Sequence, residues 1–213
     1  MKKYLFILAA LGMQMAAFAQ SDRYAGAMKA NLQQFDSAKS VADFTKLANN
    51  FERIGNAEKN QWLPYYYAGL ALSLSGWLPE VTDKDANAAR INAFCDKAES
   101  LTTSNVDKAE LQALRNMAAT QQMLVDPQNR WATNGLEAGQ AVDKGLKLDP
   151  NNPRLYYLKG MGVFGTPEQF GGGKSKAKPL FEKAAELYKN QKTAAFYPDW
   201  GKKQNEEMIA QCQ

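Results

Sequence analysis

Histidine, the side chain most often used as a general base and as a zinc ligand, is absent from the chain. The acidic residues are spread over predicted helix surfaces, and no pair of carboxyl groups stands in an apolar setting that would separate their pKa values. No nucleophile motif such as G-x-S-x-G occurs. We therefore expect a protein that is not an enzyme, with no catalytic residue, no metal site and no cofactor.

Cys95 and Cys212 are the two cysteines of the chain, too few and too far apart to build a zinc site. In an oxidising compartment they could pair, and closing so long a loop would stabilise the fold by about 4 to 5 kcal/mol. Alternatively, Cys95 is a small buried residue on an apolar helix stripe, and Cys212, next to the last residue, stays free. The sequence leaves both open.

A glycine-rich segment at 166–173 is the most unusual local sequence, and with Lys174 and Ser175 it imitates the end of a phosphate-binding P-loop. It fails that test because Glu168 replaces the required first glycine and no strand precedes it. A weaker alternative is that its amides hold some other anion at the start of the next helix. Its aromatic either marks a functional loop tip or folds back as a plug on the core. The candidate binding residues of this loop are Phe170, Gly171, Gly172 and Gly173.

The N-terminus reads as a secretory signal peptide. Lys2 and Lys3 precede the apolar run 4–18, and Ala17-Phe18-Ala19 fits an A-x-A cleavage site. The run is shorter than the roughly 20 residues that span a bilayer, and no cysteine stands near the cut to accept a lipid. We expect cleavage after Ala19, a single domain over 20–213, a periplasmic or secreted location and no stable membrane anchor afterwards.

Loss of residues 1–20 lowers the formal net charge from +4 to +2, because it removes two lysines and no acid. A net charge so close to zero gives no electrostatic reason to expect a nucleic-acid partner. The remaining residues suit one domain with enough apolar content for a packed core.

Hydrophobic residues recur at helical spacing throughout, and no useful stretch alternates as a strand does. Capping pairs Ser40 with Asp43 and Ser104 with Asp107 predict two helix starts, and Asn152 with Pro153 predicts a third. Eight helices of similar length, with a ninth left over from near Pro198, predict an all-α fold of antiparallel helix pairs and a C-terminal capping helix.

Residues in the second half of the chain carry a family resemblance. The residues expected of the second helix of a tetratricopeptide repeat occur at its intervals, as Ala138, Val142, Gly145 and Pro150, and again as Ala177, Phe181 and Ala184. The small residues let two helices approach, the larger Val142 or Phe181 fills the gap between them, and the proline ends the helix. Tyr65 and Tyr156 each precede a glycine by four residues, at Gly69 and Gly160. The chain resembles small periplasmic tetratricopeptide-type (TPR-like) proteins with degenerate repeats, and the 166–173 segment is similar to the glycine-rich insertion of the TPR-type subunit in some solute transporters.

The resemblance implies a right-handed superhelix with a concave groove that binds a peptide or a protein partner. Adjacent tyrosines cannot all face one core, so we expect Tyr66, Tyr67 and Tyr157 in that groove and Tyr65, Tyr156 and Phe181 in the core. The first hypothesis is therefore a non-enzymatic interaction module. The second is a carrier of a small solute or anion, in which the loop 166–173 closes over the ligand.

Overall fold

The computed structural model describes residues 22–191 and 194–213, and these ranges contain helices and no β-strand. The expected all-α class is confirmed, whereas the expected signal peptide lies outside the described residues. After a first helix described from 22 to 32 come η1 (Phe35–Ser37), α2 (Val41–Glu58), α3 (Leu63–Ser75), α4 (Lys84–Glu99), α5 (Asn105–Met123), α6 (Pro127–Arg130), η2 (Trp131–Gly135), α7 (Leu136–Leu148), α8 (Pro153–Gly165), η3 (Glu168–Phe170), α9 (Lys174–Asn190) and α10 (Lys202–Gln211).

Three predicted helix starts are confirmed by their caps. The Ser40 hydroxyl accepts from the Asp43 amide at 3.1 Å, and the Asp43 carboxylate accepts from the Ser40 amide at 3.0 Å, which completes a capping box. Ser104 caps α5, and Asn152 caps α8 ahead of a first-turn proline. These local signals place helix ends because each satisfies amides that the helix leaves unpaired.

One glycine inside a helix serves packing, and one helix boundary differs from the prediction. α2 runs through Gly55 to Glu58 and closes on Lys59 in the left-handed conformation. A Cβ at Gly55 would lie 2.7 Å from Cζ of Tyr65, so the glycine serves the close approach of α3. The last helix starts at Lys202, not near Pro198, and residues 194–201 instead form a connection of turns and irregular structure.

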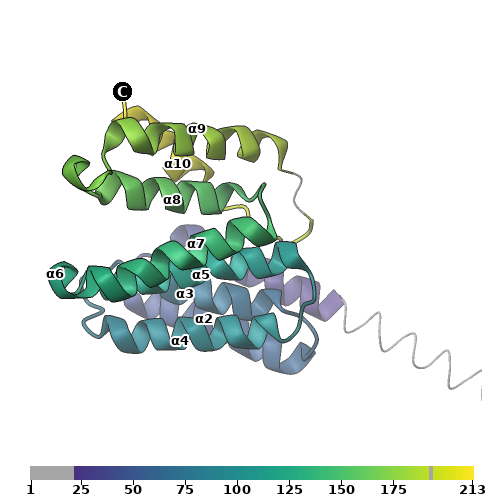
Figure 1. The fold of residues 1–213 in the computed structure, drawn as a ribbon. Helices are drawn as coiled ribbons and strands as arrows, with labels where there is room; N and C mark the ends of the chain where they lie inside the picture. Colours follow the sequence, from purple (N-terminus) through teal and green to yellow (C-terminus); the bar gives the residue numbers. More distant parts are fainter. Residues whose placement is uncertain (1–21, 192–193) are drawn as a thin grey trace, which may run out of the picture.

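The helices pack as neighbours along the chain, most extensively α5 with α7, α2 with α3 and α8 with α9. Helices α2 to α7 form one body, and α8, α9 and α10 form a layer above α7 (Figure 1). Because successive helices run in opposite directions, the connections α3–α4, α5–α7 and α8–α9 all lie at one end of the molecule, where Figure 1 labels α6.

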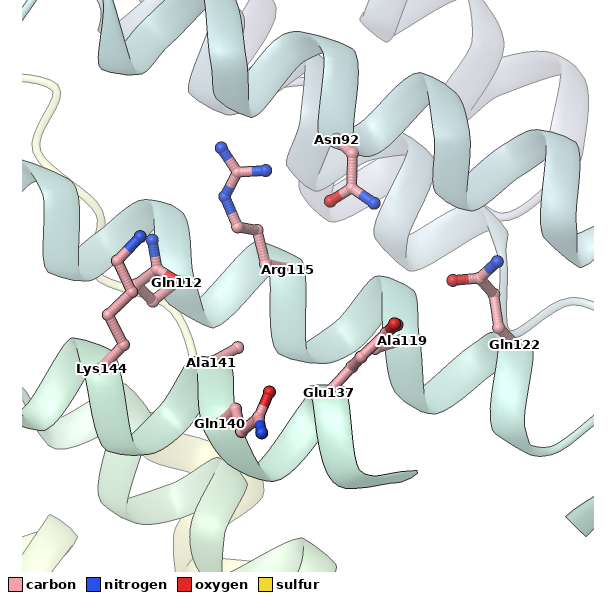
Figure 2. Close-up of a pocket in the computed structure, with 9 residues that line it drawn as sticks. All are labelled: Asn92, Gln112, Arg115, Ala119, Gln122, Glu137, Gln140, Ala141 and Lys144. Atoms are coloured by element: carbon pink, nitrogen blue, oxygen red, sulfur yellow. The ribbon is translucent and has the colours of Figure 1, made fainter. Parts of the chain in front are cut away.

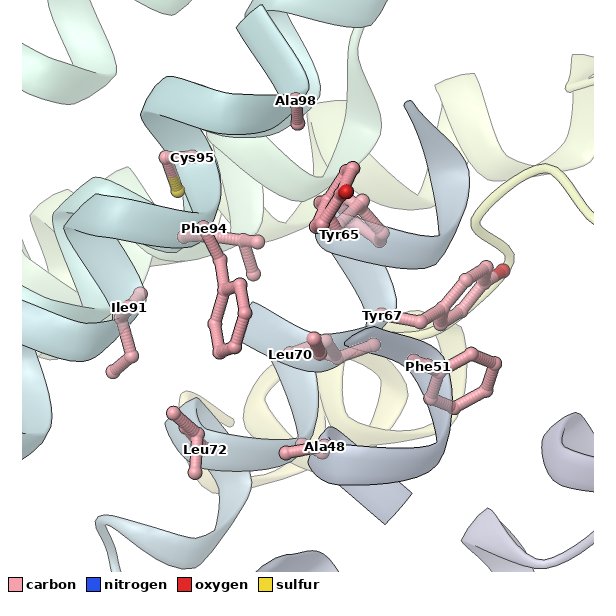
Figure 3. Packing of buried hydrophobic residues seen from close by; sticks show 14 of the residues in the cluster. Ala48, Phe51, Tyr65, Tyr67, Leu70, Leu72, Ile91, Phe94, Cys95 and Ala98 are labelled. Carbon is pink, nitrogen blue, oxygen red and sulfur yellow. The ribbon is translucent and has the colours of Figure 1, made fainter. Parts of the chain in front are cut away.

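The main core lies among the N-terminal helices and includes Phe51, Tyr65, Leu70, Ile91 and Cys95 (Figure 3). Cys95 is buried there, Cys212 is half-buried in a separate cluster with Phe181, and both thiols are free. The structure thus shows no Cys95–Cys212 disulfide, because each cysteine packs in a different core. Phe196 and Trp200 of the 194–201 connection pack back onto the main core.

Two glycines lie where neighbouring helices pack closely. A Cβ on Gly160 would lie 2.5 Å from the Phe181 ring, and one on Gly145 would lie 2.6 Å from Leu155. Glycine at these two positions therefore lets a large side chain of the facing helix approach the backbone. Phe181 itself is fully buried.

Candidate functional site

Tyr66 and Tyr67 lie in the core, not on an open surface. The Tyr66 hydroxyl accepts from Nε1 of Trp200 at 2.7 Å, and the Tyr67 hydroxyl donates to the Phe196 carbonyl at 2.9 Å. Burial raises the pKa of both phenols well above the ordinary value. The expectation that these rings leave the core is wrong, because the 194–201 connection covers them and satisfies their hydroxyls.

Tyr157 is half-buried on α8 and packs against Phe181, with ring centroids 6.2 Å apart. Burial, and secondarily the charge of Glu207, raise the pKa of its hydroxyl. Tyr157 is therefore part of the α8–α9 packing and is separated from Tyr66 and Tyr67, so the three predicted groove tyrosines do not form one surface.

The glycine-rich loop presents its aromatic outward. Phe170 is 74% exposed at the tip, so it is not a plug on the core. Gly171 and Gly173 have φ of +90° and +96°, which favour glycine, and a Cβ on Gly172 would collide with Thr166. The three glycine amides donate to carbonyls of Glu168, Pro167 and Val163, at 2.9, 3.2 and 3.0 Å. These amides are therefore unavailable to an anion.

Positive charge beside Phe170 comes from the start of α9. Lys174 and Lys176 are exposed on its first turn, and Nζ of Lys176 lies 3.9 Å from the position of a Cβ on Gly171. The helix dipole adds positive potential at the same end. The loop thus joins an exposed ring to two cations, an arrangement suited to an apolar ligand that carries negative groups.

A second exposed aromatic is placed by a π-helical turn. The Leu136 amide donates to the Trp131 carbonyl, five residues earlier, so this turn holds one residue more than an α-helical turn. Trp131 is 66% exposed and Leu136 is also exposed. The π turn therefore carries exposed apolar residues at both of its ends, and such turns occur frequently at functional sites.

These side chains are part of a larger apolar region. Of the eight large hydrophobic residues exposed among the described residues, one, Val106, lies at the opposite end, beside the α4–α5 connection. The other seven lie at or near the connections at the α6 end (Figure 1). We call them the apolar end: Trp77, Leu124, Val125, Trp131, Leu136, Met161 and Phe170.

Part of the apolar end is hollowed. A pocket of about 180 Å³ is lined by Trp77, Leu124 and Val125, together with Lys84. The Lys84 ammonium donates to the carbonyls of Gly76 and Leu78, at 2.6 and 2.9 Å, and so caps the end of α3. Exposed hydrophobic residues that gather in one region commonly mark a binding surface, whereas single exposed ones are ordinary on any protein.

The sequence predicted Phe170 in this region and missed the rest of the apolar end. A signal was present, because Leu124 and Val125 stand directly before the helix break at Asp126, and Trp131 follows it. Chain turns are usually polar, so large apolar residues on both sides of a turn indicate a surface with a partner or ligand.

A different, polar hollow of about 400 Å³ runs between α4 and α7, with α5 as its floor. Figure 2 shows Arg115 and Gln112 rising from α5, Asn92 above them on α4, and Glu137 and Lys144 below them on α7. We call this hollow the α4–α7 groove. It shares no lining residue with the pocket at the apolar end.

Within the described ranges, His, Cys, Asp and Glu form no group that could hold a metal ion. None of the described helices combines the length and the hydrophobicity needed to cross a membrane. The apolar end offers aromatic rings, aliphatic groups and nearby lysines.

Comparison with known proteins agrees with a ligand-binding role. No protein-family model and no curated protein sequence matches the chain. Among solved structures, the HusA haemophore from Porphyromonas gingivalis matches with a TM-score of 0.81 and 32% sequence identity, over 89% of this chain and 92% of that one.

This likeness overturns the first functional hypothesis. The structural neighbour is a haemophore, a protein that binds a small molecule, rather than a module that binds a peptide in a concave groove. The burial of Tyr66 and Tyr67 removes the side chains on which that groove depended. The alternative of a small-solute carrier is the better supported of the two. With 32% identity across nearly the whole of both chains, the protein belongs to the family of the HusA haemophore.

Proposed function

We propose that this protein is a carrier of haem or a closely related porphyrin, and that the ligand binds at the apolar end. The observation that carries the proposal is the gathering of seven exposed hydrophobic side chains at one end of a member of a haemophore's family. A porphyrin is a flat apolar ring with carboxylates on one edge. It therefore needs apolar faces for the ring and cations near that edge.

The apolar end supplies both requirements. Trp131 and Phe170 are its most exposed aromatic rings, and flat rings stack well on a macrocycle. Lys174 and Lys176 stand next to Phe170, and no ion pair engages either of them within the described residues. By pairing with the propionate carboxylates on the edge of the porphyrin, these lysines would orient the ligand.

Further parts of the proposal rest on the sequence. We propose an exported, single-domain, non-enzymatic carrier whose helix pairs stack in a TPR-like right-handed superhelix. The signal-peptide pattern of residues 1–19 supports export. The close pairing of α5 with α7 and of α8 with α9 supports the repeat arrangement, as do the small-residue contacts at Gly145 and Gly160.

The test is a haemin titration followed by Soret absorbance. Phe170→Ala and Trp131→Ala should each weaken binding about tenfold, because each removes a ring that the ligand covers. Val106→Ala is the matched control, since Val106 is an exposed hydrophobic residue, 46% accessible, at the opposite end of the molecule. Unchanged haemin affinity in the Phe170→Ala/Trp131→Ala double variant would place the ligand elsewhere.

A further inference from the structure

The α4–α7 groove contains hydrogen-bond donors without acceptors. Gln112 is 1% exposed, it lines the groove, and its Nε2 has no hydrogen-bond partner. The Nε of Arg115, one turn further along α5, is also buried and unpartnered. Native structures rarely leave a buried donor unpaired, since a protein group, an ordered water or a ligand accepts its hydrogen bond.

One cation of the groove is free to pair with an anion. The Arg115 guanidinium is already balanced by two α4 carboxylates, Asp96 at 2.7 Å and Glu99 at 3.1 Å, both on one terminal nitrogen, while its buried Nε has no partner. Lys144 lines the same end as Gln112 and forms no ion pair among the residues the structure describes (Figure 2).

Glu137 lies at the opposite end of the groove, where its negative charge would repel an anion. It stands seven residues before Lys144 on α7, which places it about 10 Å away along the helix. A carboxylate beside Lys144 is therefore well separated from Glu137, whereas one at the far end would be repelled. Ala119 and Ala141 keep space open between the walls.

We propose that the α4–α7 groove is a second ligand site, which binds a small organic acid through its carboxylate. The carboxylate accepts hydrogen bonds from Nε2 of Gln112 and Nε of Arg115 and pairs with the Lys144 ammonium. This site is separate from the apolar end and does not depend on the porphyrin proposal, because the two surfaces share no lining residue.

The test follows the side-chain amide of Gln112 by NMR in ¹⁵N-labelled protein, and Gln112→Leu identifies that signal by its loss. Succinate, added at constant ionic strength, should shift the signal saturably. Lys144→Ala should weaken succinate binding about tenfold, as expected for loss of a charge-assisted contact. Lys147→Ala is the matched control, since Lys147 is exposed on the same helix outside the groove, and it should change nothing.

Two results would overturn the proposal. One is a Gln112 signal that does not move with succinate, which would leave the donors solvated by water alone. The other is a signal that moves with haemin and not with succinate, which would make the groove part of the porphyrin site. Phe170→Ala/Trp131→Ala should leave succinate binding unchanged, so failure of the porphyrin proposal is seen separately.

Discussion

Arg154 of α8 and Glu110 of α5 form a fully buried ion pair, with 0% and 1% of their side chains exposed. Nε of Arg154 donates to one carboxylate oxygen at 2.7 Å, and a terminal nitrogen donates to the other at 2.5 Å. Asn152 donates to the same carboxylate. Burial alone would lower the Arg154 pKa, but the charge and hydrogen bonds of Glu110 raise it above its ordinary value. The pair thus ties the α8–α10 layer to the body below.

Removal of one partner should be strongly destabilising. Glu110→Ala leaves the Arg154 guanidinium buried without its counter-ion, and we expect a loss of about 3 to 5 kcal/mol in the free energy of unfolding, measured by urea titration. Glu110→Leu/Arg154→Met should recover much of that loss, since no charge then remains buried. A single variant as stable as the parent would mean that water reaches the guanidinium.

Phe181 and Gly160 should behave as a coupled pair. Phe181→Ala is expected to cost about 3 to 5 kcal/mol by leaving a cavity between α8 and α9. Gly160→Ala should cost about 1 to 3 kcal/mol alone, because its Cβ would meet the Phe181 ring at 2.5 Å. In the Phe181→Ala background the same change should cost much less. Additive effects in thermal or urea unfolding would contradict the contact.

Local signals in the sequence predicted much of this fold. The caps at Ser40, Ser104 and Asn152 and the glycine contact at Gly160 depend on neighbouring residues or on a repeated spacing, so the sequence alone could show them. The burial of Tyr66 could not be predicted in this way. It depends on Trp200, 134 residues away, which folds back to cover it.

The apolar end could not be predicted from the sequence for a similar reason. Its members come from three connections that antiparallel helices bring to one end, and the stretch 124–136, which contains four of the seven, does not show that the other three lie at the same end. The π turn at 131–135 also shifts the helical register by one residue, so an α-helical pattern misplaces the residues on its two sides relative to each other.

The two thiols should react at very different rates. Cys95 is buried, and burial raises its pKa to about 12, whereas Cys212 is half-buried near the C-terminus. With a chromogenic disulfide reagent at pH 8, we expect one thiol to react quickly and the other only on unfolding. Cys212→Ser should abolish the fast reaction. Absence of any reactive thiol in the native protein would instead indicate the disulfide that the structure lacks.

Alkaline pH should destabilise the protein because its buried tyrosine hydroxyls and its buried cysteine thiol must then ionise. Burial raises the pKa of Tyr24 to about 12 and also raises those of Tyr66, Tyr67 and Tyr188. A tyrosine in the unfolded chain ionises near pH 10 and a cysteine near 8.5, so the folded state binds more protons above those values. The resulting stability is complete below about pH 8.5 and is lost as pH rises toward 12.

The measurement is the urea midpoint from pH 8 to 11.5, with tyrosinate absorbance followed in parallel. We expect the midpoint to fall across this range and the buried tyrosines to ionise together with the loss of helical circular dichroism. Ionisation of every tyrosine near pH 10 in a protein that stays helical would show that these rings are accessible to solvent.

Porphyrin affinity should depend little on the metal. The chain has no histidine, the axial ligand that holds haem in globins and peroxidases, so the apolar faces of the proposed site must supply most of the binding free energy. We expect metal-free protoporphyrin and haemin to bind within about threefold of each other, a difference of under 1 kcal/mol. Met161 at the apolar end is an alternative axial ligand, since a thioether can ligate haem iron. If haemin bound more than tenfold tighter and Met161→Leu removed that advantage, the iron would be ligated and the apolar account would be incomplete.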